Sequence, residues 1–285
     1  MATVHRLYIM LASLTSAIAV ILALVALATE YWVESEYNYS ELGSDDIIHG
    51  NINYGLFSGM ETSYLTSSRW AIYITCLYGH NICGWLCDSD GDRRADILEQ
   101  YYENETYTNT DRINCNSISK AFPVTFHTHS LKGNEYDERS FINAGAYLCT
   151  VLFLIFAVVS GAVAAGLSAW NSVMNPIYWW LSIPALYICN LVAFLCTVLY
   201  MSLWGGMYAV TIHKDVVTME TLNRVAKTNG LADLGYSYWI NFVPLVFYPV
   251  SIGLLYTRSI IISRDPIHQI EKSMDTPENP DIYLF

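Results

Sequence analysis

Charged residues are scarce in this chain of 285 residues, and they are missing altogether from three long stretches. They make up 14% of the sequence, whereas a soluble domain carries about 25%. No Asp, Glu, Lys, Arg or His occurs in residues 7–29, 140–212 or 234–257. A helix needs about 20 apolar residues to cross a bilayer, so the outer two stretches fit one crossing each. The middle stretch is long enough for two crossings, and the sequence therefore predicts a membrane protein with four spanning helices.

Positive charge is the scarcer sign, which excludes another class of function. The chain has 14 Lys and Arg against 26 Asp and Glu. Nucleic-acid-binding proteins need basic patches, so we expect no nucleic-acid partner. Pumps and ion-coupled transporters usually place ionisable groups within their membrane helices, and the three uncharged stretches offer none. No nucleophile–base pair or phosphate-binding loop is visible either, so we expect no catalytic activity and no cofactor.

The middle uncharged stretch contains its own turn signal. Two Asn, a Ser and a Pro fall within Asn171-Ser-Val-Met-Asn-Pro176, a composition typical of turns. Trp170, Trp179 and Trp180 flank it, as aromatic residues do at the headgroup level of a bilayer. Asn190, in the helix that follows, is expected to hydrogen-bond to a neighbouring helix.

These observations predict a mainly α-helical membrane protein with both termini in the cytoplasm and the lipid bilayer of the plasma membrane as its environment. Arg6, Arg258, Arg264 and Lys272 flank the spans on the side of the termini, which favours that orientation. One alternative is a cleaved secretory signal, because Ala26-Leu-Ala28 matches a signal-peptidase site. The predicted boundaries are a cytoplasmic N-terminus at 1–6, spans at 7–29, 141–170, 179–208 and 238–262, exterior segments at 30–140 and 209–237, a cytoplasmic turn at 171–178 and a cytoplasmic tail at 263–285.

The first exterior segment, residues 30–140, holds most of the charge. It contains 18 acidic and 7 basic residues, so it accounts for −11 of the net charge of −12. Residues 53–59 and 69–78 have the glycine, β-branched and aromatic pattern of strands. Asn38 and Asn104 begin N-glycosylation sequons, and both lie in this segment.

Four cysteines occur in the same segment, at Cys76, Cys83, Cys87 and Cys115. In an oxidising compartment four cysteines indicate two disulfides, with three possible pairings. Zinc is the alternative, because Cys83 and Cys87 have a C-x3-C spacing and His80, His127 and His129 are near them in the sequence.

One acidic run has nearly the spacing of a twelve-residue calcium loop. Carboxylates at positions 1, 3, 5, 9 and 12 of such a loop can surround one Ca²⁺. The position that normally holds glycine is Arg93, so a solvated acidic loop is the alternative. The candidate ligands are Asp88, Asp90, Asp92, Asp96 and Glu99.

The C-terminal tail ends in Tyr283-Leu-Phe285, with three prolines upstream of it in residues 263–285. A free carboxylate with apolar side chains at Tyr283 and Phe285 suits capture in a PDZ-type groove of a cytoplasmic scaffold protein. The alternative is an apolar chain end with no partner.

Four short segments, in their order and spacing, resemble the clarins, a branch of the claudin-like tetraspan proteins. They are Ala28-Thr-Glu-Tyr-Trp32, Tyr54-Gly-Leu-Phe-Ser-Gly59, Trp170-Asn-Ser-Val-Met-Asn-Pro176 and Gly235-Tyr-Ser-Tyr-Trp239. The residues that carry the resemblance are Trp32, Tyr54, Gly55, Leu56, Phe57, Asn171, Asn175, Pro176, Tyr236 and Trp239.

The resemblance implies a four-helix claudin-like bundle with a small disulfide-linked extracellular β-sheet domain and no catalysis. It also implies a role as an adhesion protein or scaffold in sensory cells, linked to actin and to synaptic organisation. Residues 60–140 depart from the family, since this span is longer and richer in cysteine than a clarin's. Residues 30–140 are the expected contact region for a membrane or extracellular protein. The alternative function is an auxiliary, γ-type subunit of an ion channel.

Overall fold

The computed structural model describes residues 2–40, 47–63, 68–103, 141–173, 183–218, 226–228 and 230–264. The chain forms two compact units, which we treat separately. The helical unit is drawn from Met1–Val20, Ala157–Phe194 and Pro244–Phe285. The sheet unit is drawn from Ile21–Phe156 and Leu195–Val243.

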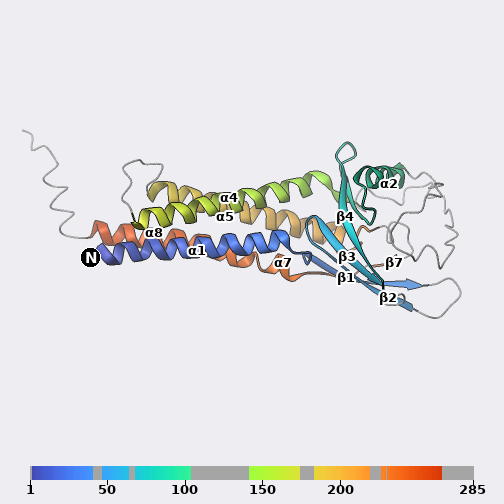
Figure 1. The fold of residues 1–285 in the computed structure, drawn as a ribbon, viewed down its shortest axis with the longest axis horizontal. Coiled ribbons are helices and arrows are strands. Elements are labelled where there is room, and N and C mark those ends of the chain that lie inside the picture. The colour runs from blue at the N-terminus through green and yellow to red at the C-terminus, as the bar shows by residue number, and fades with distance from the viewer. Residues whose placement is uncertain are drawn as a thin grey trace, which may run out of the picture. The chain divides into compact units, whose positions relative to one another are not determined.

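Four long helices are the main α-helical elements (Figure 1). They are α1 (Ala2–Ala28), α4 (Ala144–Val173), α5 (Ile183–Met207) and α8 (Phe242–Ser263). A five-residue π-helix, η3 (Tyr208–Ile212), continues α5, and a single turn, α7 (Tyr236–Trp239), precedes α8. Each of the four spans is long and apolar enough to cross a membrane, which confirms the prediction of four such helices.

The helices also expose large apolar side chains. Met10 and Leu14 on α1, Phe156 on α4 and Leu195 on α5 are all exposed. A monomeric soluble protein rarely leaves such surfaces uncovered, whereas the hydrocarbon of a bilayer covers them without cost. The exposure therefore fits a multi-pass membrane protein in contact with lipid.

The core of the helical unit is built from small residues facing large ones. Ala12 of α1 packs with Leu186 of α5 and Leu255 of α8. Further along α1, Ala19 packs with Ala193 and Tyr248. Apolar surface gains little from leaving lipid, so van der Waals contact at close approach is what favours this packing.

A buried polar cluster joins three helices of this unit. Ser16 Oγ on α1 donates to Asn190 Oδ1 on α5 at 2.9 Å and lies 3.0 Å from Ser251 Oγ on α8. All three side chains are fully buried. The amide of Asn190 also donates to the Leu186 carbonyl oxygen at 2.8 Å. Asn190 thus makes the interhelical hydrogen bond that its position predicted.

The described residues of the sheet unit form one antiparallel sheet of eight strands. The strand order is β6-β5-β4-β3-β2-β1-β7, and β8 also pairs with β1. The bounds are β1 Val33–Ser40, β2 Ile47–Tyr54, β3 Ser58–Ser63, β4 Ser68–Leu77, β5 Ile82–Leu86, β6 Ile142–Asn143, β7 Ala226–Lys227 and β8 Ala232–Leu234. The strand predicted at 69–78 is β4, and the prediction that a strand ends or turns at the glycines of 53–59 is confirmed, since β2 ends at Tyr54 and β3 begins at Ser58.

Buried and more exposed side chains alternate along β1 to β3 and the start of β4, because successive residues of a strand point to opposite faces, whereas β5 is buried along its whole length. The register aligns the buried residues Ser35, Ile52, Glu61 and Trp70 in one row across β1 to β4. The Trp70 indole donates to Glu61 Oε2 at 3.1 Å within that row. The sheet is curled, since Tyr54 of β2 stacks on Trp85 of β5 with ring centroids 4.3 Å apart although two strands lie between them.

Two described parts of the segment after η3 contact the sheet, residues 216–218 beside β5 and residues 226–228 and 230–234 beside β1. The backbone N–H of Trp85 at the β5 edge donates to the Val217 carbonyl oxygen at 2.8 Å. At the other edge β7 and β8 pair with β1. The hydroxyl of Thr228 accepts from the Val216 N–H and donates to Asp215, which joins residues 215–216 to Thr228.

A disulfide joins Cys76 of β4 to Cys83 of β5, which face each other in the register. Cys87 is disulfide-bonded as well, and Cys115 lies outside the described residues. The zinc alternative that used Cys83 and Cys87 is therefore wrong, because both sulfurs are in disulfides. Cys149, Cys189 and Cys196 are free, and Cys149 is exposed on α4.

The polar cluster predicts a measurable contribution to the stability of the helical unit. Asn190→Leu should lower the free energy of unfolding by about 0.6 to 2 kcal/mol, the range for a hydrogen bond between membrane helices, because Ser16 loses its acceptor. Unfolding in mixed detergent micelles measures the change. The control is Thr257→Ala, which removes an exposed hydroxyl bonded only within its own helix. Equal stability of Asn190→Leu and wild type would contradict a structural role for the cluster.

Candidate functional site

The segment between α1 and β1, residues 29–32, is held on two sides by other parts of the sheet unit. On one side the Trp32 N–H donates to the Tyr54 carbonyl oxygen at 2.9 Å. On the other side the carbonyl oxygens of Tyr31 and Trp32 accept from the N–H groups of Ser237 and Gly235, at 3.0 and 3.1 Å. We call residues 29–32, 54–58 and 235–237 the junction.

The side chain of Trp32 is the centre of the junction. It is fully buried, and its indole donates to the Ala26 carbonyl oxygen at 2.6 Å, at the end of α1. Trp204 of α5 packs edge-on against the ring at 5.2 Å and Tyr238 of α7 at 6.3 Å. One aromatic side chain thus contacts three helices and fixes where the sheet begins.

Two glycines allow the backbones to approach each other at the junction. A Cβ atom at Gly55 would overlap the Thr29 carbonyl oxygen, and one at Gly235 would overlap that of Tyr31. Both obstacles are backbone atoms, which cannot rotate away as a side chain could. The glycines of two resemblance segments therefore have a steric reason to be glycine.

The exposed face of the sheet offers a partner an ordered polar surface. The register aligns Glu36, Asn51, Thr62 and Arg69 in one row across β1 to β4, on the face opposite Trp70. Thr62 is half-buried and the other three are exposed. Glu34 is exposed two residues before Glu36 on β1, so the β1 end of this face is acidic and the β4 end is basic. We call this row, with Glu34, the polar face.

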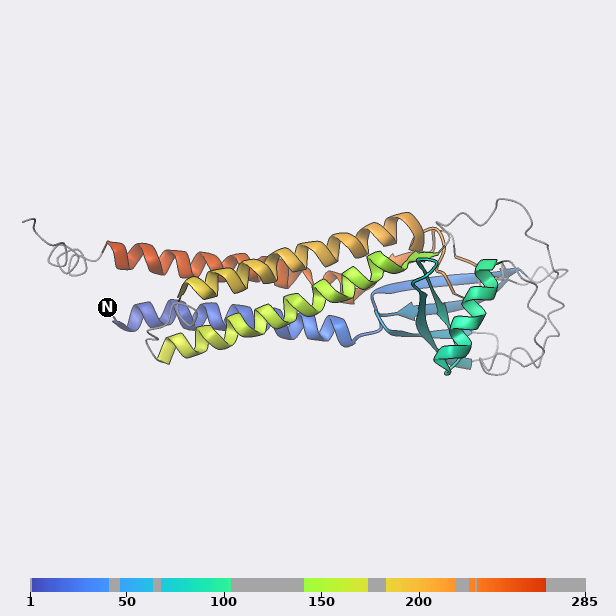
Figure 2. The same ribbon diagram turned by 90° about the horizontal axis from the view of Figure 1, so that it is seen from above.

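The predicted calcium loop does not form, because most of it is helix α2 (Gly91–Glu103), which lies along β4 and β5 (Figure 2). Asp90 precedes the helix and accepts from the Asp92 N–H at 3.1 Å, as a helix-capping residue does. Asp88 is buried and already accepts from the Asp90 N–H and from Arg93. The helical backbone places Asp92, Asp96 and Glu99 along its axis instead of around one ion.

Arg94 fastens α2 to the sheet. Its guanidinium lies over the Tyr73 ring, 5.0 Å from the centroid, and donates to Thr75 at 2.9 Å and to the Asp88 carbonyl oxygen at 2.7 Å. The carboxylate spacing of this stretch predicted only an ion-binding or solvated loop. The apolar pair Ile97-Leu98, which the structure buries, is the signal that indicated a packed helix.

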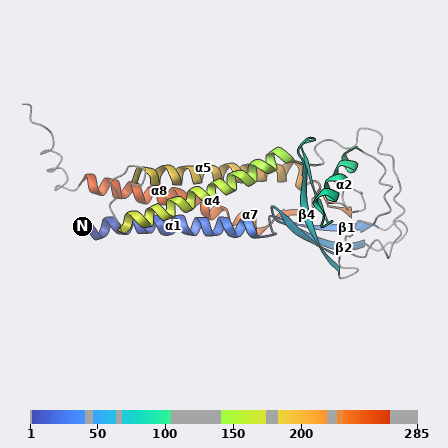
Figure 3. The same cartoon turned by 45° about the horizontal axis from the view of Figure 1, so that its top comes forward.

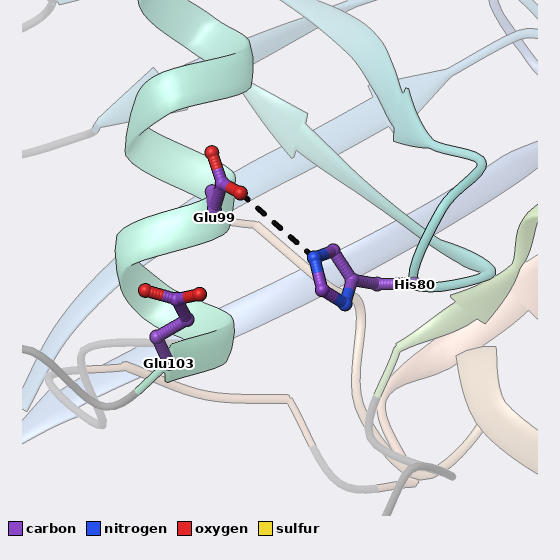
Figure 4. Close-up of side chains that lie close together, drawn as sticks. All are labelled: His80, Glu99 and Glu103. Carbon is purple, nitrogen blue, oxygen red and sulfur yellow. Dashed lines mark ion pairs between the residues drawn. The ribbon is translucent and has the colours of Figure 1, made fainter.

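A different set of potential metal ligands does come together in the sheet unit. His80, in the turn between β4 and β5, lies beside Glu99 and Glu103 of α2 (Figure 4). Only Glu99 of this set belongs to the predicted calcium ligands.

The remaining predicted site residues fall in several places. Asn38 lies within β1, paired with His49 of β2 and Lys227 of β7. Asn171 is buried near the end of α4, where its amide donates to the Leu167 carbonyl oxygen at 2.8 Å. Asn104, Asn175, Pro176, Tyr283 and Phe285 lie outside the described residues, as do His127 and His129.

The large side chains in and next to the junction include a buried and an exposed group. Tyr54 and Leu56 are buried, and burial raises the pKa of the Tyr54 phenol well above its ordinary value, with Asp215 adding to the effect. Tyr31 and Tyr236 stack on each other at 5.1 Å and are exposed, as are Phe57 and Trp239. The exposed group has the amphipathic character of residues at a membrane–water interface.

The junction predicts a cost for any side chain at its glycines. Gly55→Ala and Gly235→Ala should each lower the free energy of unfolding by about 1 to 3 kcal/mol, because the backbones must move apart. Gly79→Ala is the control, since no atom of the described residues lies within 4 Å of its added Cβ, and its effect should stay within about 0.5 kcal/mol. Thermal unfolding in detergent measures all three. A Gly55→Ala protein as stable as Gly79→Ala would show that the close approach is not needed.

Comparison of the chain with protein-family models and with curated proteins found no match.

Proposed function

We propose that this protein is a non-enzymatic, clarin-like tetraspan protein of the plasma membrane that organises membrane complexes in sensory cells. The observation that carries the proposal is the polar face, an ordered surface with charge of both signs that is displayed by the segment between the first two membrane helices. A scaffold needs such a surface, whereas an enzyme needs a pocket with convergent reactive groups.

Three of the four clarin-like segments support the proposal by their location. Ala28–Trp32, Tyr54–Gly59 and Gly235–Trp239 are far apart in the sequence and meet at the junction. The hydroxyl groups of Thr29 and Ser237, for example, lie 2.7 Å apart. These three segments together hold one part of the fold. Proteins with the same four-helix plan are therefore expected to carry the same segments in the same order and at similar spacing.

The proposed orientation puts the sheet unit outside the cell and both termini in the cytoplasm. Disulfides form in oxidising compartments, and the Cys76–Cys83 bond favours the exterior for this unit. In this orientation the polar face contacts a membrane or extracellular protein, and Tyr283 and Phe285 bind a PDZ-type scaffold that links the complex to actin.

N-glycans test the orientation, because oligosaccharyl transfer occurs only on the side that becomes extracellular. Protein made in animal cells should gain gel mobility after glycosidase treatment, and Asn38→Gln and Asn104→Gln should each remove part of the shift. Asn171→Gln, in a span and without a sequon, is the control and should leave the shift unchanged. Unchanged mobility of the wild type after digestion would argue against an exterior sheet unit.

The polar face predicts that reversed charges reduce partner binding without unfolding the protein. Glu36→Lys and Arg69→Glu should each lower the yield of neighbouring proteins in proximity labelling about tenfold, since an opposed charge costs about 1.4 kcal/mol or more. The control is Asp96→Lys. Asp96 is exposed on α2, outside the polar face, and its replacement makes the same charge change as Glu36→Lys.

The identity of the labelled proteins separates the two functional hypotheses. Adhesion or cytoskeletal proteins that disappear with Glu36→Lys and stay with Asp96→Lys would support the scaffold. A pore-forming channel subunit that is lost with Glu36→Lys and kept with Asp96→Lys would support the alternative hypothesis, an auxiliary subunit of an ion channel. Equal labelling by all variants would remove the polar face from the mechanism.

A further inference from the structure

The turn between β4 and β5, residues 78–81, is fixed in place from several directions. The Cys76–Cys83 disulfide closes the strands just below it. Asn81 has a positive φ of 56°, which reverses the chain, and its side chain accepts from the Gly145 N–H at 2.9 Å. Its carbonyl oxygen accepts from the Ala144 N–H at 3.2 Å, so Asn81 caps the start of α4. His80 is therefore presented by a turn that is anchored at both ends.

The imidazole of His80 is also oriented. Its ring lies 4.7 Å from the ring of Tyr102, and Tyr102 in turn contacts Phe141 at 6.2 Å. His80 Nε2 points toward the side chain of Glu99, 3.8 Å from Oε1 (Figure 4). A ring held on one face by an aromatic side chain, with a nitrogen aimed at a carboxylate, is preorganised as a ligand.

Helix α2 provides two carboxylates on the same side. Glu99 and Glu103 are four residues apart, so they are neighbours on the helix surface. Arg94 holds α2 against β4, and the two elements lie side by side in Figure 3. The two glutamates thus approach the turn from a fixed direction. Two like charges at this spacing repel each other, and among the described residues only His80 forms an ion pair with either of them.

We propose that His80, Glu99 and Glu103 bind a divalent first-row metal ion, with Zn²⁺ as the best match. Their ligand atoms all lie within 4.8 Å of one another. In a tetrahedral site two ligands at about 2.0 to 2.2 Å from zinc lie about 3.3 to 3.6 Å apart. His80 Nε2 and Glu99 Oε1, at 3.8 Å, are close to this spacing, so small side-chain rotations bring all three ligands onto one ion.

The donor atoms decide which ion fits. One imidazole nitrogen with two carboxylates is a set that zinc accepts, and water completes the fourth position in such three-ligand sites. Calcium prefers six to eight oxygen ligands, which this arrangement does not supply. The ion neutralises the charge of the two glutamates and joins the β4–β5 turn to α2.

The test uses the full chain in lipid nanodiscs with zinc chloride as the probe. Isothermal titration should show one zinc ion bound, and zinc should raise the unfolding temperature in a way that a chelator reverses. Loss of an outer-shell partner alone weakens metal binding about 10- to 100-fold, so loss of a ligand should weaken it about 100-fold or more. His80→Ala and Glu103→Gln are the ligand variants, and Asp96→Asn is the control on the exposed surface of the same helix.

Co²⁺ in place of zinc distinguishes this site from the free cysteines. Visible absorption without a thiolate charge-transfer band is expected, because none of the three ligands is sulfur. Both ligand variants should lose the absorption and should melt at the wild-type temperature when metal is absent. Retained binding in either variant, an equal loss in Asp96→Asn, or a thiolate band would each overturn the proposal.

Discussion

The hydrogen bonds of residues 29–32 are the constraint on which the rest of the sheet unit depends. This short segment leaves α1, and its backbone groups bond on one side to Tyr54 at the end of β2 and on the other to Gly235 and Ser237 at the start of α7. Buried peptide groups must be paired, so neither neighbour can shift without leaving donors or acceptors unsatisfied. The position of β1 follows from the junction, and the register of β2, β3 and β4 follows from β1.

The sequence predicted the features that depend on whether a residue lies in water or in lipid, and it missed the features that depend on which strands and helices lie next to each other. The spans were visible because a soluble domain rarely contains an uncharged stretch of about 20 residues. The role of Asn190 was visible because an amide in hydrocarbon needs a partner. The identity of β7 and β8 was not visible, since strands of two and three residues have no periodicity and are defined only by β1. The prediction for residues 88–99 was wrong because the carboxylate spacing alone ignores the apolar pair Ile97 and Leu98.

The metal ligands show the same division. In the sequence His80 lies near cysteines and Glu99 lies within a calcium-like pattern, and no motif connects the two. Nineteen positions separate them in the chain, and only the antiparallel return of β5 and the packing of α2 brings them side by side. Glu103 belongs to no motif at all. Ligand sets assembled from a turn and a helix are therefore accessible only after the fold is known.

The strand order also has a consequence for how the protein is made. The partners of β1 at its outer edge are residues 226–227 and 232–234, which follow α4 and α5 in the chain. During synthesis β1 to β5 emerge first, and the edge of β1 stays unpaired while two membrane helices are still being translated. An unpaired edge is a template for wrong pairing with other chains. Truncations before residue 226 should for this reason be cleared by quality control, and the nascent first segment should be a substrate for chaperones throughout that interval.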